Sequence, residues 1–373
     1  MTIATSPTSS IAPAQLADRL AQGERITVLD LREDAEWGIE APGVTSRQVL
    51  PAGVLADPVA VAQELSGPVA VVCNRGLTAQ PVVDALRRLG VDAMVVESGM
   101  RGWILALQTR PVDLGIKGLV VRQIQRPGRG CLSYLLAADG QALVVDPAPD
   151  AAFYVALAQE LGARITDIVD THLHADHLSG ARVLSEQTGA TLRLPALALE
   201  RGVAYADEVE PLRDGDTIML GPVKLQAIAL PGHTTDMTGL LIAGRALIGG
   251  DSLFLDGIAR PDLQQSDPEG ALAMGCILHE TLRDRVLALG EDVVLLPGHT
   301  HAGVKANAVA ARLADVRVAV AELAIDDPSE FAAKLLSEMP PRPANYEAII
   351  AVNAGAHPFD PELETGGNSC SAG

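Results

Sequence analysis

Several residue types and patterns are scarce or absent in this sequence, and most of these absences argue against a class of protein. Aromatic residues make up only 3% of the 373 residues. The four cysteines, at positions 73, 131, 276 and 370, show no paired spacing, which argues against a disulfide framework. No apolar run reaches the roughly 18 residues of a membrane span, and Met1 to Ser10 lacks an apolar signal core. The sequence therefore predicts a cytoplasmic protein.

Positive charge is also in short supply. Lys and Arg number 28 against 47 Asp and Glu, for a net charge of −19. This balance argues against nucleic acid or an anionic membrane as a partner. The length of 373 residues is sufficient for two domains with separate cores.

The order of apolar runs divides the chain into four parts. Residues 1–10 are rich in Ser, Thr and Pro and are expected to form a disordered tail. Over 11–110, short apolar runs alternate with helical spacing, which is typical of an α/β domain with a parallel sheet. Residues 111–117 form the expected linker. The remainder, 118–373, contains two strand-rich halves separated by a helix and is consistent with an αββα sandwich.

Two helices are predicted near the C-terminus. The segment 304–323 is rich in Ala and Val at helical spacing. A second helix is expected over 330–336, with Ser329 as its N-cap.

One short segment concentrates side chains that bind metals. Residues 171–177, Thr-His-Leu-His-Ala-Asp-His, follow a β-branched apolar run that predicts a strand. His172 and His174 are two residues apart, so they point to the same side of an extended backbone. Asp176 and His177 fall where the chain turns toward the next helix, and Asp176 is also a candidate catalytic residue.

Three more potential ligands come directly after predicted strands. His233 and His299 each lie in Leu-Pro-Gly-His-Thr, and Asp251 lies in Ile-Gly-Gly-Asp. Imidazoles and carboxylates are expected ligands of zinc, iron or manganese. One histidine after a strand is usually a surface residue, but the repetition at four strand ends predicts a metal site. Three other histidines are predicted to face solvent, namely His279, His301 and His357.

The seven candidates allow two arrangements. In a binuclear site, the first ion would be held by His172, His174 and His233, and the second by Asp176, His177 and His299, with Asp251 as a bridge. Such a site suits attack of a metal-bound hydroxide on an ester or thioester carbonyl. In a mononuclear site, His172, His233 and Asp251 would form the facial triad of Fe(II) oxygen chemistry, while the other four orient the ligands.

Cys73 lies between a predicted strand, 69–72, and a predicted helix, 79–89. Free N–H groups and the positive dipole end of a helix N-terminus lower the pKa of a thiol and bind anions. Arg75 is the only cation of the intervening loop and a candidate anion-binding residue. The alternative is a buried structural cysteine. Three cysteines have no metal-ligand spacing and are predicted to be structural or bystanders: Cys131, Cys276 and Cys370.

The motifs from residue 117 onward resemble those of a known superfamily. His-x-His-x-Asp-His, followed by Pro-Gly-His, Gly-Asp and a second Pro-Gly-His, resembles the metallo-β-lactamase fold. Residues 250–254 and 259–265 are similar to the persulfide dioxygenases, as are Pro-Ala-Asn-Tyr at 343–346 and Asn353.

This resemblance implies oxidation of a low-molecular-weight thiol persulfide by O₂ to sulfite and thiol, at one Fe(2+) per chain held by His172, His233 and Asp251. It also suggests a homodimer and leaves the identity of the thiol open. Arg260 would be a substrate-binding or ligand-orienting residue, or else a surface ion pair with Asp262. The alternative is a glyoxalase II-like thioester hydrolase with two Zn(2+).

The first hundred residues resemble a rhodanese domain. The resemblance covers 11–107 and rests on Leu-Asp-Leu-Arg-Glu at 29–33 with Glu36-Trp37, on Cys73 in its loop, and on Glu-Ser-Gly-Met-Arg-Gly-Trp at 97–103. It implies that Cys73 carries sulfane sulfur as a persulfide. Rhodanese loops often have an arginine near the end, where this chain has Thr78. The alternative is a sulfur-binding or docking module in which Cys73 is not catalytic.

Overall fold

The computed structural model describes residues 9–33, 37–265, 267–342 and 344–364. The chain divides into two compact units. Unit 1 contains residues 1–108, 125–130 and 301–307, and unit 2 contains residues 109–124, 131–300 and 308–373. Residues 1–8 of the expected N-terminal tail lie outside the described residues, whereas Ser10–Ile11 form strand β1.

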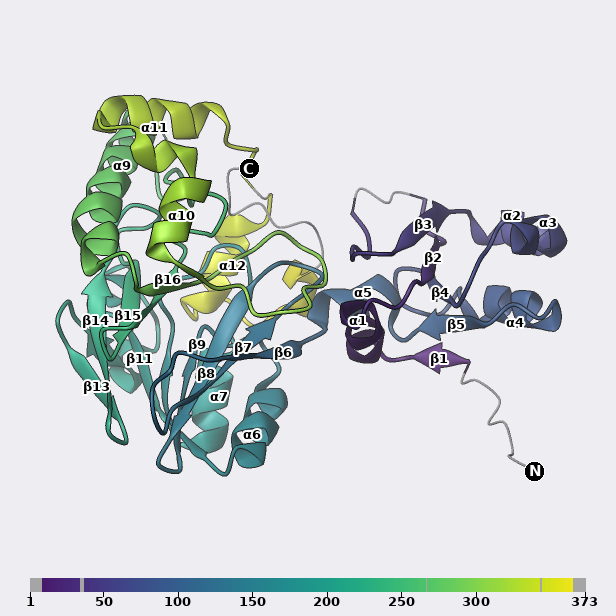
Figure 1. Cartoon of the computed structure of the whole chain (residues 1–373), viewed down its shortest axis with the longest axis horizontal. Helices are drawn as coiled ribbons and strands as arrows, with labels where there is room; N and C mark the ends of the chain where they lie inside the picture. Colours follow the sequence, from purple (N-terminus) through teal and green to yellow (C-terminus); the bar gives the residue numbers. More distant parts are fainter. Residues whose placement is uncertain (1–8, 34–36, 266, 343, 365–373) are drawn as a thin grey trace. The chain divides into compact units, whose positions relative to one another are not determined.

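Unit 1 is built on a parallel sheet of five strands in the order β1-β5-β4-β2-β3 (Figure 1). Its remaining strands are β2 (Thr27–Asp30), β3 (Thr45–Gln48), β4 (Val69–Val72) and β5 (Ala93–Val96). Its helices are α1 (Pro13–Ala21), α2 (Pro51–Ala56), α3 (Pro58–Gln63), α4 (Gln80–Arg88) and α5 (Gly99–Leu105). The predicted parallel sheet is therefore confirmed.

Apolar residues of β4 explain why both faces of this sheet are covered. Val69 and Val71 belong to a core shared with α2, α3 and α4, while Ala70 and Val72 belong to the core on the opposite face, shared with α1 and α5. Successive side chains of a strand point to opposite faces, so a continuous apolar run is buried on both. The short helices α2 and α3 escaped prediction. Each begins at a proline, Pro51 or Pro58, whose missing N–H costs nothing at the first helical position.

Unit 2 contains two sheets. The first has the order β12-β11-β10-β9-β8-β7-β6 and the second the order β13-β14-β15-β16-β17-β18. The strands of the first are β6 (Gln108–Val112), β7 (Val120–Gln125), β8 (Leu132–Ala138), β9 (Gln141–Val145), β10 (Arg164–Val169), β11 (Thr191–Pro195) and β12 (Glu210–Leu212). Those of the second are β13 (Thr217–Leu220), β14 (Val223–Ala229), β15 (Thr238–Ile242), β16 (Ala246–Gly250), β17 (Val294–Pro297) and β18 (Ala311–Arg312).

Helices cover the outer faces of the two sheets (Figure 1). The first sheet packs against α6 (Ala151–Glu160) and α7 (Ala181–Thr188). The second shares a core with α9 (Pro268–Thr281) and α11 (Pro328–Ser337). The inner faces meet in a core that includes Leu136 and Val145 of one sheet and Leu225 and Ile248 of the other. This layering is the predicted αββα sandwich.

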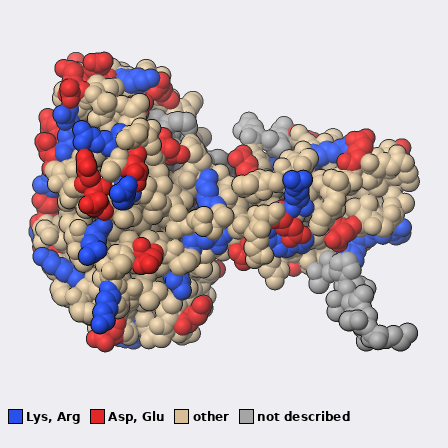
Figure 2. Space-filling model, viewed as in Figure 1, with Lys and Arg blue, Asp and Glu red and all other residues tan. Residues whose placement is uncertain are grey.

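The remaining helical segments are short. They are α8 (Ala196–Glu200), η1 (Ala206–Glu208), η2 (Leu282–Val286), η3 (Leu287–Leu289), α10 (Leu313–Ala319), η4 (Ala321–Ala324), α12 (Tyr346–Asn353) and η5 (Pro361–Glu364). No helix among the described residues is long and apolar enough to cross a membrane. Acidic and basic side chains are interspersed over the face shown in Figure 2.

Two local predictions differ from the structure, and the bounds of a third segment overlap a strand. The expected linker 111–117 includes the end of β6. The helix predicted over 304–323 is wrong in its first half, because α10 begins only at Leu313, after β18. Asp327, not Ser329, caps α11, since its carboxylate accepts the backbone N–H of Glu330.

Candidate metal centre and reactive cysteine

The predicted metal-binding side chains all follow strand ends in unit 2. The loop after β10 carries the 171–177 segment, and His233, Asp251 and His299 follow β14, β16 and β17. Strands β16 and β17 are parallel neighbours, which places Asp251 and His299 at the same edge of their sheet. Within this edge the seven side chains separate into three clusters.

The first cluster consists of His172, His233 and Asp251, whose ligand atoms lie within 4.8 Å of one another. All three side chains are buried. Within the described part of the chain, His172 Nε2 and Asp251 Oδ2 have no hydrogen-bond partner. Buried polar atoms normally have a hydrogen-bond partner. An imidazole nitrogen and a carboxylate oxygen that lack one are suited to bind a cation.

Neighbouring groups orient the three side chains. His172 Nδ1 lies 3.0 Å from Thr171 Oγ1, and His233 Nδ1 lies 2.8 Å from the carbonyl oxygen of Arg260. Both histidines therefore direct Nε2 toward the cluster. Burial is the largest cause that lowers the pKa of His172 and of His233. Both imidazoles are thus neutral, as metal ligands must be.

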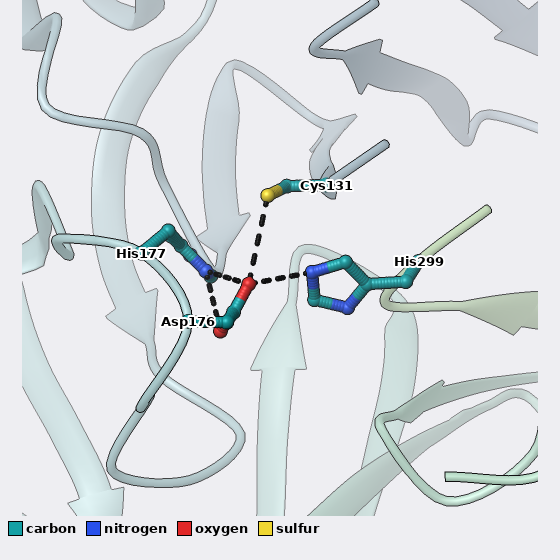
Figure 3. Close-up of side chains that lie close together, drawn as sticks. All are labelled: Cys131, Asp176, His177 and His299. Carbon is teal, nitrogen blue, oxygen red and sulfur yellow. Dashed lines mark hydrogen bonds and ion pairs between the residues drawn. The ribbon is translucent and has the colours of Figure 1, made fainter. Parts of the chain in front are cut away.

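The second cluster is centred on the carboxylate of Asp176 (Figure 3). His177 Nδ1 lies 2.9 Å from both of its oxygens, and His299 Nε2 lies 2.7 Å from Oδ2. The other nitrogen of His299, Nδ1, lies 2.7 Å from Asp251 Oδ1. Burial would lower the pKa of His177 and of His299, but the adjacent carboxylates outweigh it and raise both pKa values well above the usual one.

Cys131, predicted to be a structural cysteine or a bystander, belongs to this second cluster. Its Sγ lies 3.7 Å from Asp176 Oδ2. Burial would raise the pKa of the thiol, but His177 and His299 outweigh it and lower the pKa to about 5. A β-bridge between Cys131 and His299 holds the two together. This pairing joins distant segments, and no local spacing signals it.

The third cluster joins His174 to two carboxylates that escaped prediction, Asp146 and Asp170. His174 Nε2 lies 3.1 Å from Asp146 Oδ1, so this nitrogen is engaged outside the first cluster. Asp146 also accepts hydrogen bonds from the backbone N–H and the hydroxyl of Thr171. Its position directly after β9 is the same signal that marked the other ligands.

Asn353 and Glu364, near the C-terminus, form hydrogen bonds with the backbone of the loop that follows β10. The amide nitrogen of Asn353 donates to the carbonyl oxygens of His174 and His177, each at 2.9 Å. Its amide oxygen accepts the backbone N–H of Ser179. A buried carboxylate, Glu364, accepts the N–H of Leu178.

Arg260 contacts the metal cluster through its backbone. Its carbonyl oxygen binds His233, whereas its guanidinium pairs with Asp262 at 2.7 Å and donates to the carbonyl oxygen of Pro340. The side chain is 1% exposed. The ion pair with Asp262 is therefore buried, not on the surface. Two of the other three histidines are exposed, but His279 is buried against Ile325 and Phe331, contrary to prediction.

Cys73 lies in unit 1, directly after β4 and before α4. The side chain is buried and lines a pocket of about 830 Å³. Burial would raise the pKa of the thiol, but hydrogen bonds from the Thr78 hydroxyl and from the N–H groups of Thr78, Arg75 and Gly76 lower it. These donors surround the sulfur and stabilise a thiolate.

Gly99 sets the shape of this loop. The N–H of Met100 donates to the carbonyl oxygen of Cys73 at 2.8 Å. A Cβ at Gly99 would lie 2.0 Å from the same oxygen. The backbone of Gly99 also has a φ of 59°, in the left-handed region. Only glycine permits this close approach, which explains the glycine in the 97–103 motif.

Comparison with known proteins agrees with this fold. The model of the metallo-β-lactamase superfamily matches residues 126–300. Hydroxyacylglutathione hydrolase of Anaeromyxobacter dehalogenans is 31% identical over 233 residues, which cover 61% of this chain and 82% of that protein. The chain therefore belongs to the metallo-β-lactamase superfamily, and its C-terminal part has the metallo-β-lactamase fold.

Relatives with another activity match at similar levels. Human mitochondrial persulfide dioxygenase ETHE1 is 28% identical over 197 residues, which cover 51% of this chain and 72% of that protein. The crystal structure of ETHE1 from Myxococcus xanthus is 26% identical with a TM-score of 0.55, and the match covers 64% of this chain and 99% of that one. The family is thus defined, and two activities are represented among the relatives.

Proposed function

We propose that this protein oxidises the terminal sulfur of a low-molecular-weight thiol persulfide at a single Fe(II), and that Cys73 exchanges sulfane sulfur with thiols. The unequal state of the donor atoms supports the single metal. His172 Nε2 and Asp251 Oδ2 lack a hydrogen-bond partner among the described residues, whereas the Asp176 carboxylate is hydrogen-bonded to both His177 and His299. Two histidines and one carboxylate are the ligand set of non-haem Fe(II) oxygenases.

The overall reaction would be R–S–SH + O₂ + H₂O → R–SH + SO₃²⁻ + 2H⁺. Iron would supply the position where O₂ and the persulfide sulfur meet. His172, His233 and Asp251 would hold it. His299 fixes the Asp251 carboxylate by its hydrogen bond of 2.7 Å, and the Arg260 carbonyl oxygen fixes the His233 ring at 2.8 Å.

Cys73 would perform the second half of the function. Its thiolate would take the outer sulfur of a persulfide, with release of the thiolate of the carrier, or return it in the reverse direction. The donors around Cys73 support this role, because hydrogen bonds from Thr78, Arg75 and Gly76 lower the pKa of the thiol. Because the chain is similar to persulfide dioxygenases, the metal cluster and Cys73 would act in one pathway of sulfur transfer and oxidation.

A thioester hydrolase with two Zn(II) is the second candidate. The 31% identity with a hydroxyacylglutathione hydrolase favours it. This function would require Asp176 and His299 to exchange their mutual hydrogen bond for a second metal ion. His174 could join the first ion through Nδ1, which has no hydrogen-bond partner among the described residues, and keep its contact with Asp146 through Nε2. Metal content and substrate therefore discriminate between the two candidates.

The decisive experiment measures O₂ uptake by Fe(II)-loaded protein after addition of glutathione persulfide, with metal counted in the same sample. Uptake with about one iron per chain, the content that one facial triad holds, is the expected result. His233→Ala should lower the rate by about 100-fold or more, since it removes a ligand. His279→Gln is the matched control, because His279 is also buried but its hydrogen bond within the described part of the chain is to the carbonyl oxygen of Ile325.

Two results would contradict the proposal. Hydrolysis of S-lactoylglutathione by protein that contains two zinc ions, without O₂ uptake, would establish the hydrolase. An unchanged rate in His233→Ala would remove the metal assignment.

A further inference from the structure

Part of the wall of the Cys73 pocket is apolar, and binding of an inorganic anion does not require apolar contacts. Its lining includes five apolar side chains: Leu31, Leu50, Pro51, Ala52 and Leu77. Leu50 is 45% and Leu77 is 79% exposed, so both present apolar surface outside the buried core. Apolar side chains around the opening of a pocket favour a ligand that carries apolar surface next to its reactive group.

The charge of the pocket points in the same direction. Arg32 lines it, but its guanidinium forms a bidentate pair with Asp30 at 2.7 to 3.1 Å and lies over the Trp37 ring. Arg75 is the other lining cation; it is exposed and forms no ion pair with a described residue. The lining also includes the exposed carboxylate of Glu33. Among the described residues of the lining, one available cation is offset by one anion, which suits a ligand with a single negative charge better than a dianion.

We propose that the Cys73 pocket accepts sulfane sulfur from a monoanionic organic donor, a persulfide R–S–S⁻ or a thiosulfonate R–SO₂–S⁻, in preference to inorganic thiosulfate. This inference rests on the sulfur-transfer role proposed for Cys73 and specifies its substrate class. The apolar wall contacts the R group, and the cradle of N–H and hydroxyl donors at Arg75, Gly76 and Thr78 holds the transferred sulfur.

The transfer step balances without an added oxidant. The Cys73 thiolate attacks the outer sulfur, the new S–S bond forms, and the bond between that sulfur and R–SO₂ breaks. The products are Cys73–S–S⁻ and the sulfinate R–SO₂⁻. With a persulfide donor, the leaving group is the thiolate R–S⁻. In either case the total charge is conserved, and the terminal sulfur anion remains within the donor cradle.

The test loads the full-length protein anaerobically with benzenethiosulfonate or with thiosulfate. Mass spectrometry follows addition of one sulfur atom to Cys73, and Cys73→Ser gives the background. Each rate is divided by that of free glutathione with the same donor, which removes the intrinsic reactivity of the donor. The corrected rate should favour benzenethiosulfonate by about tenfold or more, the discrimination that small apolar contacts supply.

Pocket variants give the second measurement. Leu50→Ala and Leu77→Ala should each lower the rate with benzenethiosulfonate severalfold and leave the rate with thiosulfate unchanged. Leu55→Ala is the matched control, since Leu55 is 47% exposed on the same helix as the pocket wall but does not line the pocket. Ala52→Arg adds a second cation and should raise the thiosulfate rate, whereas Ala52→Gln should not.

Equal corrected rates, or a preference for thiosulfate, would overturn the inference and leave the sulfur-transfer role intact. Failure of both donors to load Cys73 would instead remove that role. Neither result depends on iron or O₂, so the oxidation proposed at the metal cluster is tested separately.

Discussion

At the scale of single residues, histidines of one motif serve different purposes because their partner atoms differ. His172 Nε2 lies beside a carboxylate and has no hydrogen-bond partner in the described part of the chain, and burial is the main cause that lowers the pKa of His172. His177 contacts Asp176, which raises its pKa against the effect of burial. His174 contacts Asp146. The protonation state and the available lone pair thus follow from burial and from the nearest carboxylate, and not from the spacing of the motif.

A residue-scale prediction concerns Thr78→Val. The Thr78 hydroxyl is one of the groups that lower the pKa of Cys73. A thiol with a lowered pKa becomes a thiolate at lower pH, so removal of this donor should shift the rate-against-pH curve for Cys73 alkylation to higher pH. Iodoacetamide labelling across the pH range, read by mass spectrometry at Cys73, measures the shift. An unmoved midpoint would contradict the assigned hydrogen bond.

At the scale of elements, both sites lie at strand ends. Cys73 follows β4, and the metal ligands follow β10, β14, β16 and β17. Loops at strand ends are held at their base by the sheet, while their tips have the freedom to present side chains. Backbone contacts fix these loops further. Gly99 packs closely against the carbonyl oxygen of Cys73, and the Asn353 side chain donates a hydrogen bond to the carbonyl oxygen of His174.

An element-scale prediction compares two glycines. Gly99→Ala should displace the Cys73 loop, since the new Cβ would lie 2.0 Å from the Cys73 carbonyl oxygen. The rate of sulfur loading of Cys73 should fall at least tenfold, because a misplacement of about 1 Å can lower a rate by about 100-fold. Gly90→Ala is the matched control: its φ is also positive, at 85°, but nothing lies within 4 Å of its Cβ. Equal losses of sulfur loading in both variants would indicate that the strain of a positive φ, and not the contact with Cys73, causes the loss.

At the scale of the whole molecule, two units with separate cores carry separate chemistry. The Cys73 pocket lies within unit 1, and the metal ligands lie within unit 2. Each unit has its own sheet system and its own buried clusters. A change at one site is therefore expected to leave the fold of the other intact.

Metal removal tests this expectation. The metal-free protein should be less stable, because His172 Nε2 and Asp251 Oδ2 are buried and have no hydrogen-bond partner among the described residues. Fe(II) or Zn(II) at about 100 times its Kd should stabilise the fold by about 2.7 kcal/mol, measured as a rise in melting temperature over chelator-treated protein. Cys73 alkylation serves as the internal control and should not change. A melting temperature insensitive to metal would contradict the site.

Much of this architecture was readable in advance. The parallel sheet of unit 1 and the αββα sandwich followed from apolar runs of strand length separated by helical spacing, because burial of a strand or helix face imposes a period on the chain. Short elements such as α2 and α3 were missed, since six residues hold too few turns to show a period. The helix expected over 304–310 was overridden by tertiary contacts, which hold 301–307 within unit 1.

The sequence by itself determined the types of the potential ligands and their positions after strands, since residue identity and local periodicity need no long-range information. Only the tertiary structure decided which atoms meet. Cys131 joins Asp176 and His299, and Asp146 takes His174, through contacts between segments far apart in the chain. Such contacts depend on how sheets pack, and a side chain separated from its partner by a hundred residues leaves no local pattern to read.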